Sequence, residues 1–164
     1  MRIVAHRANF AGPGSGDNRR EAVDTCIDLG FEVELDVWAV GDLLWVGHDG
    51  PVWKCNPDDL RSMPILAHAK NIEAAAALAS LEVPFFCLEH DQFALCSTGE
   101  IWTNYGAPSV TRSIVCSPEL VGADETIAGF LARQNSVAGV CTDYPAVYRD
   151  MIASQFRAPE APQP

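Results

Sequence analysis

Residues 31–38 read Phe-Glu-Val-Glu-Leu-Asp-Val-Trp, and this alternation of apolar and acidic side chains predicts a β-strand. Successive side chains of a strand point to opposite faces, so Glu34 and Asp36 lie on the same face, one pleat apart. Two neighbouring carboxylates repel each other unless a cation lies between them, and oxygen ligands of this kind suit Mg²⁺ or Ca²⁺. The alternative is a half-exposed strand with a hydrated acidic face. Histidines on both sides of the strand, His6 and His48, favour the metal site.

The composition restricts the class of protein. A chain of 164 residues, 48% of them hydrophobic, suits one domain, predicted over residues 1–156 with a disordered Pro-rich tail at 157–164. The formal net charge of −11 offers no attraction to nucleic acid or to an anionic membrane. No apolar run approaches the roughly 20 residues of a membrane span, and no signal-peptide pattern occurs. We therefore expect a soluble cytoplasmic protein, and the oligomeric state stays open.

The cysteines do not follow the spacing of a metal or redox motif. None forms a Cys-x-x-Cys pair, and most lie in apolar segments. We expect reduced, small hydrophobic residues, as in a reducing compartment. The set comprises Cys26, Cys55, Cys87, Cys96, Cys116 and Cys141.

Short apolar runs alternate with helical patterns along the chain. We predict strands at residues 2–6, 31–38, 43–47, 65–70, 85–89, 101–103, 113–116 and 137–142. We predict helices at residues 17–29, 71–81, 123–134 and 146–156. This order indicates an α/β fold in which helices cover a parallel sheet.

The carboxyl ends of several predicted strands carry polar residues, including His6, Asp36, Lys70 and Asp143. In a parallel barrel, functional groups gather at the carboxyl ends of the strands, so these residues are expected at one mouth. A typical (β/α)8 TIM-type barrel takes roughly 250 residues. The chain is much shorter, and we therefore expect a compact, open or incomplete barrel that lacks some outer helices.

His6 and His48 are the candidate proton-transfer pair, because histidine gains and loses protons near neutral pH. The alternative for each is a structural or exposed histidine, and His48-Asp49-Gly50 also suits a plain turn. Arg7 and Lys70 are candidate phosphate-binding groups. Their alternative is a salt bridge to the acidic strand.

Three further residues have two interpretations each. His68 shares a strand face with Lys70 and is either a third metal ligand or a hydrogen-bonded core histidine. Asp17 either reaches the metal or caps the helix predicted from residue 17, and Asn18 either binds a phosphate or caps that helix.

Taken together, His6-Arg7, Asn18, Glu34-Leu-Asp36 and Gly47-His48-Asp49 resemble the glycerophosphodiester phosphodiesterase family. That family belongs to the phospholipase-C-like phosphodiesterases with a TIM-barrel fold, and its pattern runs His-Arg-Gly, Glu-Asn, Glu-x-Asp, His-Asp and Glu-x-Lys. The closing segment 139–145 also resembles the family's last strand. The match is specific over the first third of the chain, weaker at Lys70 and patchy afterwards.

The resemblance implies a role for each matched residue. His6 and His48 would be acid and base, Glu34 and Asp36 would bind the metal, and Arg7 and Lys70 would hold the phosphate. Three positions depart from the pattern. They are Ala8 in place of glycine, Asp17 in place of glutamate, and His68 in place of the last carboxylate. With fewer oxygen ligands than the family has, the site favours Mg²⁺ or Ca²⁺ less strongly, and Mn²⁺ becomes an alternative.

The resulting hypothesis is metal-dependent hydrolysis of a small phosphodiester by two histidines in a short, divergent member of this family. The departures motivate a second hypothesis, a barrel that binds a phosphorylated metabolite without cleaving it. The missing helices motivate a third, a barrel subunit of a larger assembly, because uncovered apolar strands usually find a partner.

Overall fold

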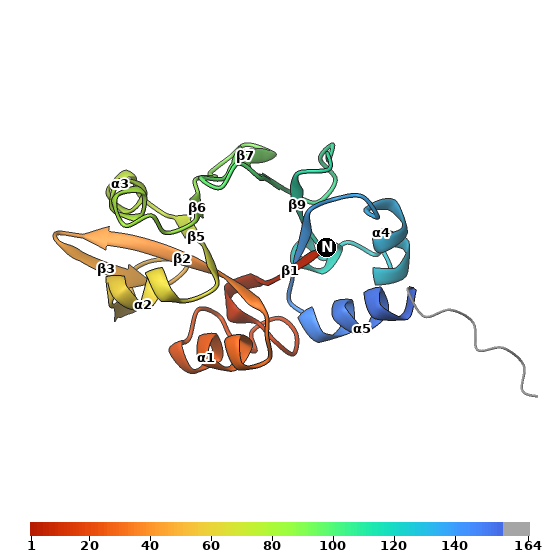
Figure 1. Cartoon of the computed structure of the whole chain (residues 1–164), viewed down its shortest axis with the longest axis horizontal. Helices are drawn as coiled ribbons and strands as arrows, with labels where there is room; N and C mark the ends of the chain where they lie inside the picture. The colour runs from red at the N-terminus through yellow and green to blue at the C-terminus, as the bar shows by residue number, and fades with distance from the viewer. Residues whose placement is uncertain (156–164) are drawn as a thin grey trace, which may run out of the picture.

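The computed structural model describes residues 1–155, so the tail predicted at 157–164 lies outside the described residues. A 10-stranded sheet forms the centre of the molecule, and the helices lie around its outside (Figure 1). The strands are β1 (Arg2–Ala5), β2 (Glu32–Val40), β3 (Leu43–Val46), β4 (Trp53–Cys55), β5 (Ile65–Ala69), β6 (Phe85–Phe86), β7 (Phe93–Leu95), β8 (Ile101–Thr103), β9 (Ser113–Cys116) and β10 (Gly139–Thr142). The helices are α1 (Arg20–Asp28), α2 (Pro57–Ser62), α3 (Ile72–Ser80), α4 (Ile127–Arg133) and α5 (Pro145–Gln155), with 3₁₀ turns η1 (His6–Ala8) and η2 (Pro118–Val121).

The central strands are parallel, in the order β6-β5-β2-β1-β10-β9-β8. Strands β3 and β4 extend the sheet from β2 as an antiparallel pair, and β7 pairs antiparallel with β8. The α/β class predicted from the sequence is therefore confirmed. The first and last strands of the chain lie side by side, since β1 pairs with β10, and this joins residues that are far apart in sequence.

The sheet curves but is not closed by a continuous ladder. Within residues 1–155, β6 and β8 do not pair with each other. One backbone hydrogen bond spans the interval, from Ser97 N to Phe85 O at 2.8 Å. The rings of Phe86 and Trp102 also stack across it, with centroids 4.1 Å apart. A complete TIM-type barrel is not confirmed.

Both faces of the curved sheet are packed. On the outer face, Val33, Leu35 and Val37 of β2 belong to a core that includes residues of α1 and α3. A second outer core lies under α4 and α5. The inner face holds a smaller apolar cluster of Val4, Leu66, Phe86, Cys96, Trp102, Ile114, Cys116 and Cys141. Because side chains alternate along β2, its acidic residues face this interior and not solvent.

Several predicted boundaries are wrong. The helix predicted from residue 17 begins at Arg20, because Asp17 and Asn18 have φ angles of 46° and 62°, outside the helical region. The strand predicted at 85–89 ends at Phe86, and the helix predicted at 123–134 begins at Ile127. Strands β4 and β7 and helix α2 were not predicted.

The expected loss of outer helices holds for one side of the sheet. No helix lies between β6 and β9 among the residues that the structure describes. Phe93 and Leu95 of β7 are 61% and 68% exposed there. The cysteines are all free, and five are buried, but Cys87 is exposed. Across residues 1–155, none of the helices is both long enough and apolar enough to span a membrane.

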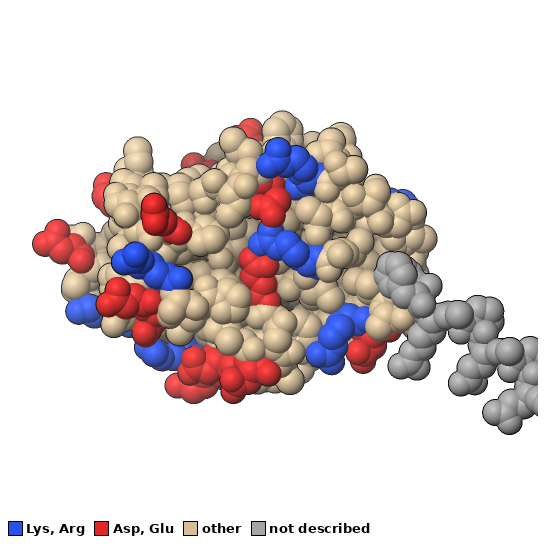
Figure 2. All heavy atoms as spheres, in the orientation of Figure 1, with Lys and Arg blue, Asp and Glu red and all other residues tan. Residues whose placement is uncertain are grey.

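We expect Arg2→Ala to lower the free energy of unfolding by about 2 kcal/mol. Arg2 bridges Glu32 at the start of β2 and Glu100 before β8, on opposite sides of the sheet interior. Figure 2 shows acidic and basic side chains alternating over the middle of one face. Removing the guanidinium leaves two half-buried carboxylates without a counter-charge. Urea unfolding measures the change, and Arg133→Ala, which breaks a more exposed pair with Glu125, is the control expected to lose much less stability. Equal losses would contradict the expectation.

Candidate active site

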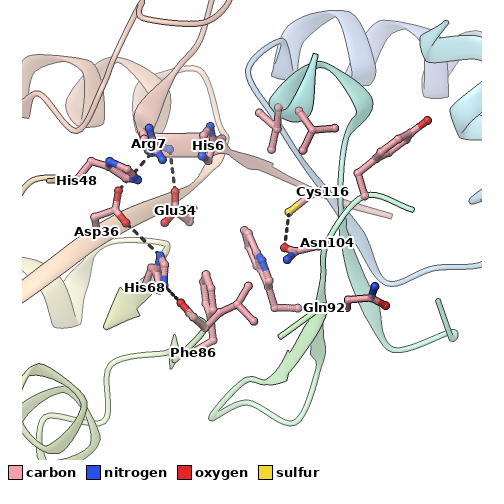
Figure 3. Close-up of a pocket in the computed structure, with 15 residues that line it drawn as sticks. His6, Arg7, Glu34, Asp36, His48, His68, Phe86, Gln92, Asn104 and Cys116 are labelled. Carbon is pink, nitrogen blue, oxygen red and sulfur yellow. Dashed lines mark hydrogen bonds and ion pairs between the residues drawn. The ribbon is translucent and has the colours of Figure 1, made fainter. Parts of the chain in front are cut away.

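A pocket of about 470 Å³ opens at the carboxyl ends of the parallel strands. Its two sides differ in chemistry, as Figure 3 shows. One side carries titratable side chains from η1, β2, β5 and the turn after β3, namely His6, Arg7, Glu34, Asp36, His48 and His68. The other side carries uncharged residues, namely Phe86, Leu88, Gln92, Trp102, Asn104, Tyr105, Cys116, Leu120 and Val121. The structure thus brings most of the site residues predicted from the sequence to one cavity.

His6 is oriented by a buried carboxylate. Its Nδ1 lies 2.9 Å from Oδ1 of Asp143, which follows β10 and is 4% exposed. Asn9 donates a second hydrogen bond to the same oxygen at 2.7 Å. Because a carboxylate accepts, Nδ1 of His6 donates, and Nε2 of the neutral ring is left able to accept a proton.

The surroundings of His6 favour its charged form. Burial alone would lower its pKa, but the hydrogen bond to Asp143 and the charges of Glu34 and Asp143 outweigh that effect and raise the pKa above its ordinary value. The carboxylate thus both fixes the ring orientation and stabilises the imidazolium that forms when His6 takes up a proton.

Arg7 follows in a strained turn, with φ of 49°, and Ala8 has φ of 58°. This conformation turns the Arg7 amide toward Glu34, whose Oε2 accepts from it at 3.0 Å. It also brings the Arg7 guanidinium to 3.4 Å from Oδ2 of Asp36. Glycine adopts such φ values without strain, whereas Arg7 and Ala8 carry side chains in this left-handed region.

Asp36 is the most heavily partnered carboxylate of the site. Its Oδ1 lies 3.1 Å from His68 Nδ1 and 3.2 Å from Lys70 Nζ, and its Oδ2 accepts from Asn18 Nδ2 at 2.9 Å. Burial opposes ionisation, but the hydrogen bonds from His68 and Asn18 and the charge of Lys70 lower the pKa of Asp36 below its ordinary value. The carboxylate is therefore ionised at neutral pH.

Glu34 has far fewer partners. It is 2% exposed, and among residues 1–155 its side chain accepts one hydrogen bond, from the Arg7 amide. Burial, and then the neighbouring charge of Asp36, raise its pKa above the ordinary value. The hydrated acidic face offered as the alternative for this strand is therefore wrong, because both carboxylates are buried.

His68 completes a group that could hold a cation. Ligand atoms of Glu34, Asp36 and His68 all lie within 4.8 Å of one another. His68 Nε2 donates to the Leu88 carbonyl at 2.8 Å, and its ring stacks on Phe86. Metal-binding histidines commonly donate their second ring N–H to a carbonyl in this way, which leaves Nδ1 directed at the ion. The residues present fit a divalent ion, since a cation there would also neutralise the poorly partnered Glu34.

His48 enters the pocket from the turn after β3. Its side chain is 40% exposed, and its Nδ1 lies 2.6 Å from Oδ1 of Asp49. The preceding Gly47 is held to β2 by its amide, which donates to Asp36 O at 3.1 Å, and by its carbonyl, which accepts from Trp38 Nε1. The turn is therefore fixed to the strand that carries the carboxylates.

Three predicted residues lie outside the pocket lining. Asn18 is 2% exposed and neither caps α1 nor lines the pocket, because its amide is used by Asp36. Lys70 contacts Asp36, so the salt-bridge alternative describes it in this structure. Asp17 is exposed and does not cap α1, so the cap interpretation is wrong, and it is not part of the Glu34–Asp36–His68 group.

Asp143 is the site residue that the sequence interpretation left without a role. It lies 137 positions from His6 and reaches it because β10 pairs with β1. Its place directly after the last predicted strand was the sequence feature that could have identified it as a site residue.

A scan against protein-family models found no match, and searches of curated proteins and of solved structures found none either.

We expect Glu34→Gln to raise the free energy of unfolding of the metal-free protein by about 1 kcal/mol at pH 7. The folded-state pKa of Glu34 lies above its ordinary 4.5, so ionised Glu34 opposes folding at neutral pH. The gain therefore shrinks as the pH falls through the raised folded-state pKa and is absent below pH 4.5. Urea unfolding in EDTA measures this. Glu32→Gln is the control on the same strand and should destabilise, since Glu32 is paired with Arg2. A less stable Glu34→Gln protein would contradict this account.

Proposed function

We propose that the chain is a metal-dependent phosphodiesterase, a short and divergent relative of the glycerophosphodiester phosphodiesterases with an incomplete (β/α)8 barrel. The observation that carries the proposal is the pocket itself, which is lined by both candidate histidines together with Glu34, Asp36 and Arg7. These are the residues on which the sequence resemblance depends. Six free cysteines suit a reducing compartment and support a cytoplasmic location.

Two histidines divide the proton transfers. One removes a proton from the attacking group, either water or a neighbouring hydroxyl of the substrate, and the other protonates the leaving oxygen. His6 is held for this work by Asp143, and His48 by Asp49. Either histidine suits either role, because each has one ring nitrogen engaged by a carboxylate and the other available.

Charge in the pocket suits a phosphate diester. Arg7 is 28% exposed and lines the pocket, so N–H groups that do not face Asp36 are available to phosphate oxygens. Glu34, Asp36 and His68 would hold a divalent ion, with Mg²⁺, Ca²⁺ and Mn²⁺ as the candidates. When bound, such an ion supplies positive charge that stabilises the phosphate in the transition state.

The test is hydrolysis of bis(4-nitrophenyl) phosphate and of glycerophosphodiesters, with EDTA or with each of the three ions. We expect turnover with at least one ion and its loss in EDTA. His48→Ala should lower kcat/KM by roughly 10²-fold or more while the fold is kept. No turnover with any ion, together with tight binding of a phosphate ester, would instead favour the non-catalytic hypothesis.

A further inference from the structure

The side of the pocket opposite the histidines is free of charged side chains among the residues that line it. Leu88, Leu120 and Val121 give it an apolar surface, and its polar side chains include Gln92 and Asn104. In Figure 3 this side faces the Glu34–Asp36–His68 group. A phosphate held at that group would therefore place one of its ester substituents against an uncharged wall.

Two acidic residues near this wall, Glu125 and Glu119, have their carboxylates engaged by other side chains. Glu125 binds Arg133 through both carboxylate oxygens, at 2.9 and 2.6 Å, and accepts from Tyr105 OH. Glu119 accepts from Ser117, Thr142 and Tyr148 and so faces β10. Two more acids, Glu89 and Asp91, lie in the exposed loop after β6 and do not line the pocket.

The aromatic rings of the wall do not form a cage for a cation either. Phe86 and Trp102 are 1% and 4% exposed, and their faces are stacked on each other. The second face of Phe86 is covered by His68. Cation–π binding needs an open ring face, and Tyr105, the third aromatic residue of this wall, is partly exposed. A quaternary ammonium group therefore finds a single partly exposed ring and no carboxylate among the residues that line this wall, which falls short of an aromatic cage.

We propose that this wall binds the alcohol part of the substrate and selects an uncharged, apolar one, a small alkyl or aryl group, over a cationic choline or ethanolamine group. The inference rests on the proposed phosphodiesterase function. In the overall reaction, diester and water give a phosphate monoester and the apolar alcohol. The P–O bond to that alcohol breaks, a P–O bond to the water oxygen forms, and the alcohol leaves with a proton.

The experiment compares kcat/KM for glycerol phosphate esters of ethanol, butanol, hexanol and choline at fixed ionic strength. We expect the hexyl ester to exceed the choline ester by about tenfold or more, since each buried methylene contributes roughly a fourfold factor. A dodecyl ester should have a kcat/KM no higher than that of the hexyl ester if the wall accommodates only a small alcohol. Equal rates for the choline and hexyl esters would overturn the inference and leave the phosphodiesterase function intact.

Val121→Glu tests the wall directly. Val121 lines the pocket and is 61% exposed, so the substitution adds a carboxylate to the wall without disturbing a core. We expect the hexyl-to-choline preference to fall by about tenfold. Val110→Glu is the matched control, since Val110 is 57% exposed and does not line the pocket, and it should keep the preference. An unchanged preference in Val121→Glu would count against the wall as the alcohol site.

Binding separates this inference from the proposed function. Calorimetry with non-hydrolysable phosphonate analogues carrying a hexyl or a choline group reports selectivity even if no diester is cleaved. Tighter hexyl binding without turnover would support the apolar wall and reject the phosphodiesterase. Turnover with tighter binding of the choline analogue would reject the wall alone.

Discussion

We expect His6→Ala to lower kcat/KM for a phosphodiester by roughly 10²–10⁴-fold, the range that a lost general acid or base accounts for. The effect is expected to be large because, of the two candidate proton-transfer histidines, His6 is the one oriented by a buried carboxylate, that of Asp143. Its side chain lines the pocket and packs little of the core, so the fold should survive. Steady-state assays with the active metal, together with circular dichroism, measure both.

Two variants make this result specific. Asp143→Asn should keep the ring in place but remove the charge that stabilises the imidazolium, and we expect a smaller loss than in His6→Ala, with a changed pH profile of kcat/KM. His90→Ala is the matched control, because the side chain of His90 is 89% exposed and does not line the pocket. Full activity in His6→Ala, or equal losses in His6→Ala and His90→Ala, would reject the two-histidine scheme.

Periodicity was a sound guide to the fold where segments were long or strongly apolar. The predicted strands at 43–47, 65–70 and 113–116 correspond to β3, β5 and β9 within a residue. The three-residue β7 contains no repeat that periodicity could detect, and its strand character comes from pairing with β8. The sequence Asn56-Pro57 is typical of a helix start and could have predicted α2. In the structure Asn56 accepts from the Asp58 amide and Pro57 stands in the first turn.

Residue type was less informative about local roles. Asp17 and Asn18 have the chemistry of helix caps, yet both adopt positive φ, and the Asn18 amide binds Asp36 instead of a helix terminus. Alternation along the second strand placed Glu34 and Asp36 on one face correctly. It could not show that the face lies inside a curved sheet, because that depends on strands more than 60 residues away in sequence, such as β8 and β9.

Asp36→Ala is expected to lower the free energy of unfolding by about 3 kcal/mol at pH 7 in EDTA. The carboxylate is 1% exposed and is the common partner of Arg7, His68 and Lys70. Without it, the guanidinium of Arg7 and the ammonium of Lys70 lose their shared counter-charge, and His68 Nδ1 loses its hydrogen-bond partner. The loss falls at the lower end of the range for a broken buried pair because the side chains of Lys70 and Arg7 are 17% and 28% exposed and keep some hydration.

Urea unfolding of Asp36→Ala and Asp59→Ala compares the loss of a buried carboxylate that has several partners with the loss of an exposed ion pair. Asp59 contacts Arg20 in a pair that is 36% and 50% exposed, and its loss should cost under about 1 kcal/mol. The folded-state pKa of Asp36 lies below its ordinary 3.8, so its contribution is complete above pH 3.8 and disappears as the pH falls through the lower folded value. Wild type and Asp36→Ala should therefore converge on acidification, whereas a difference that persists in acid would assign the loss to packing. If the two variants lost the same free energy of unfolding at pH 7, the account would be rejected, because hydration and not Asp36 would then compensate the charges of Arg7 and Lys70.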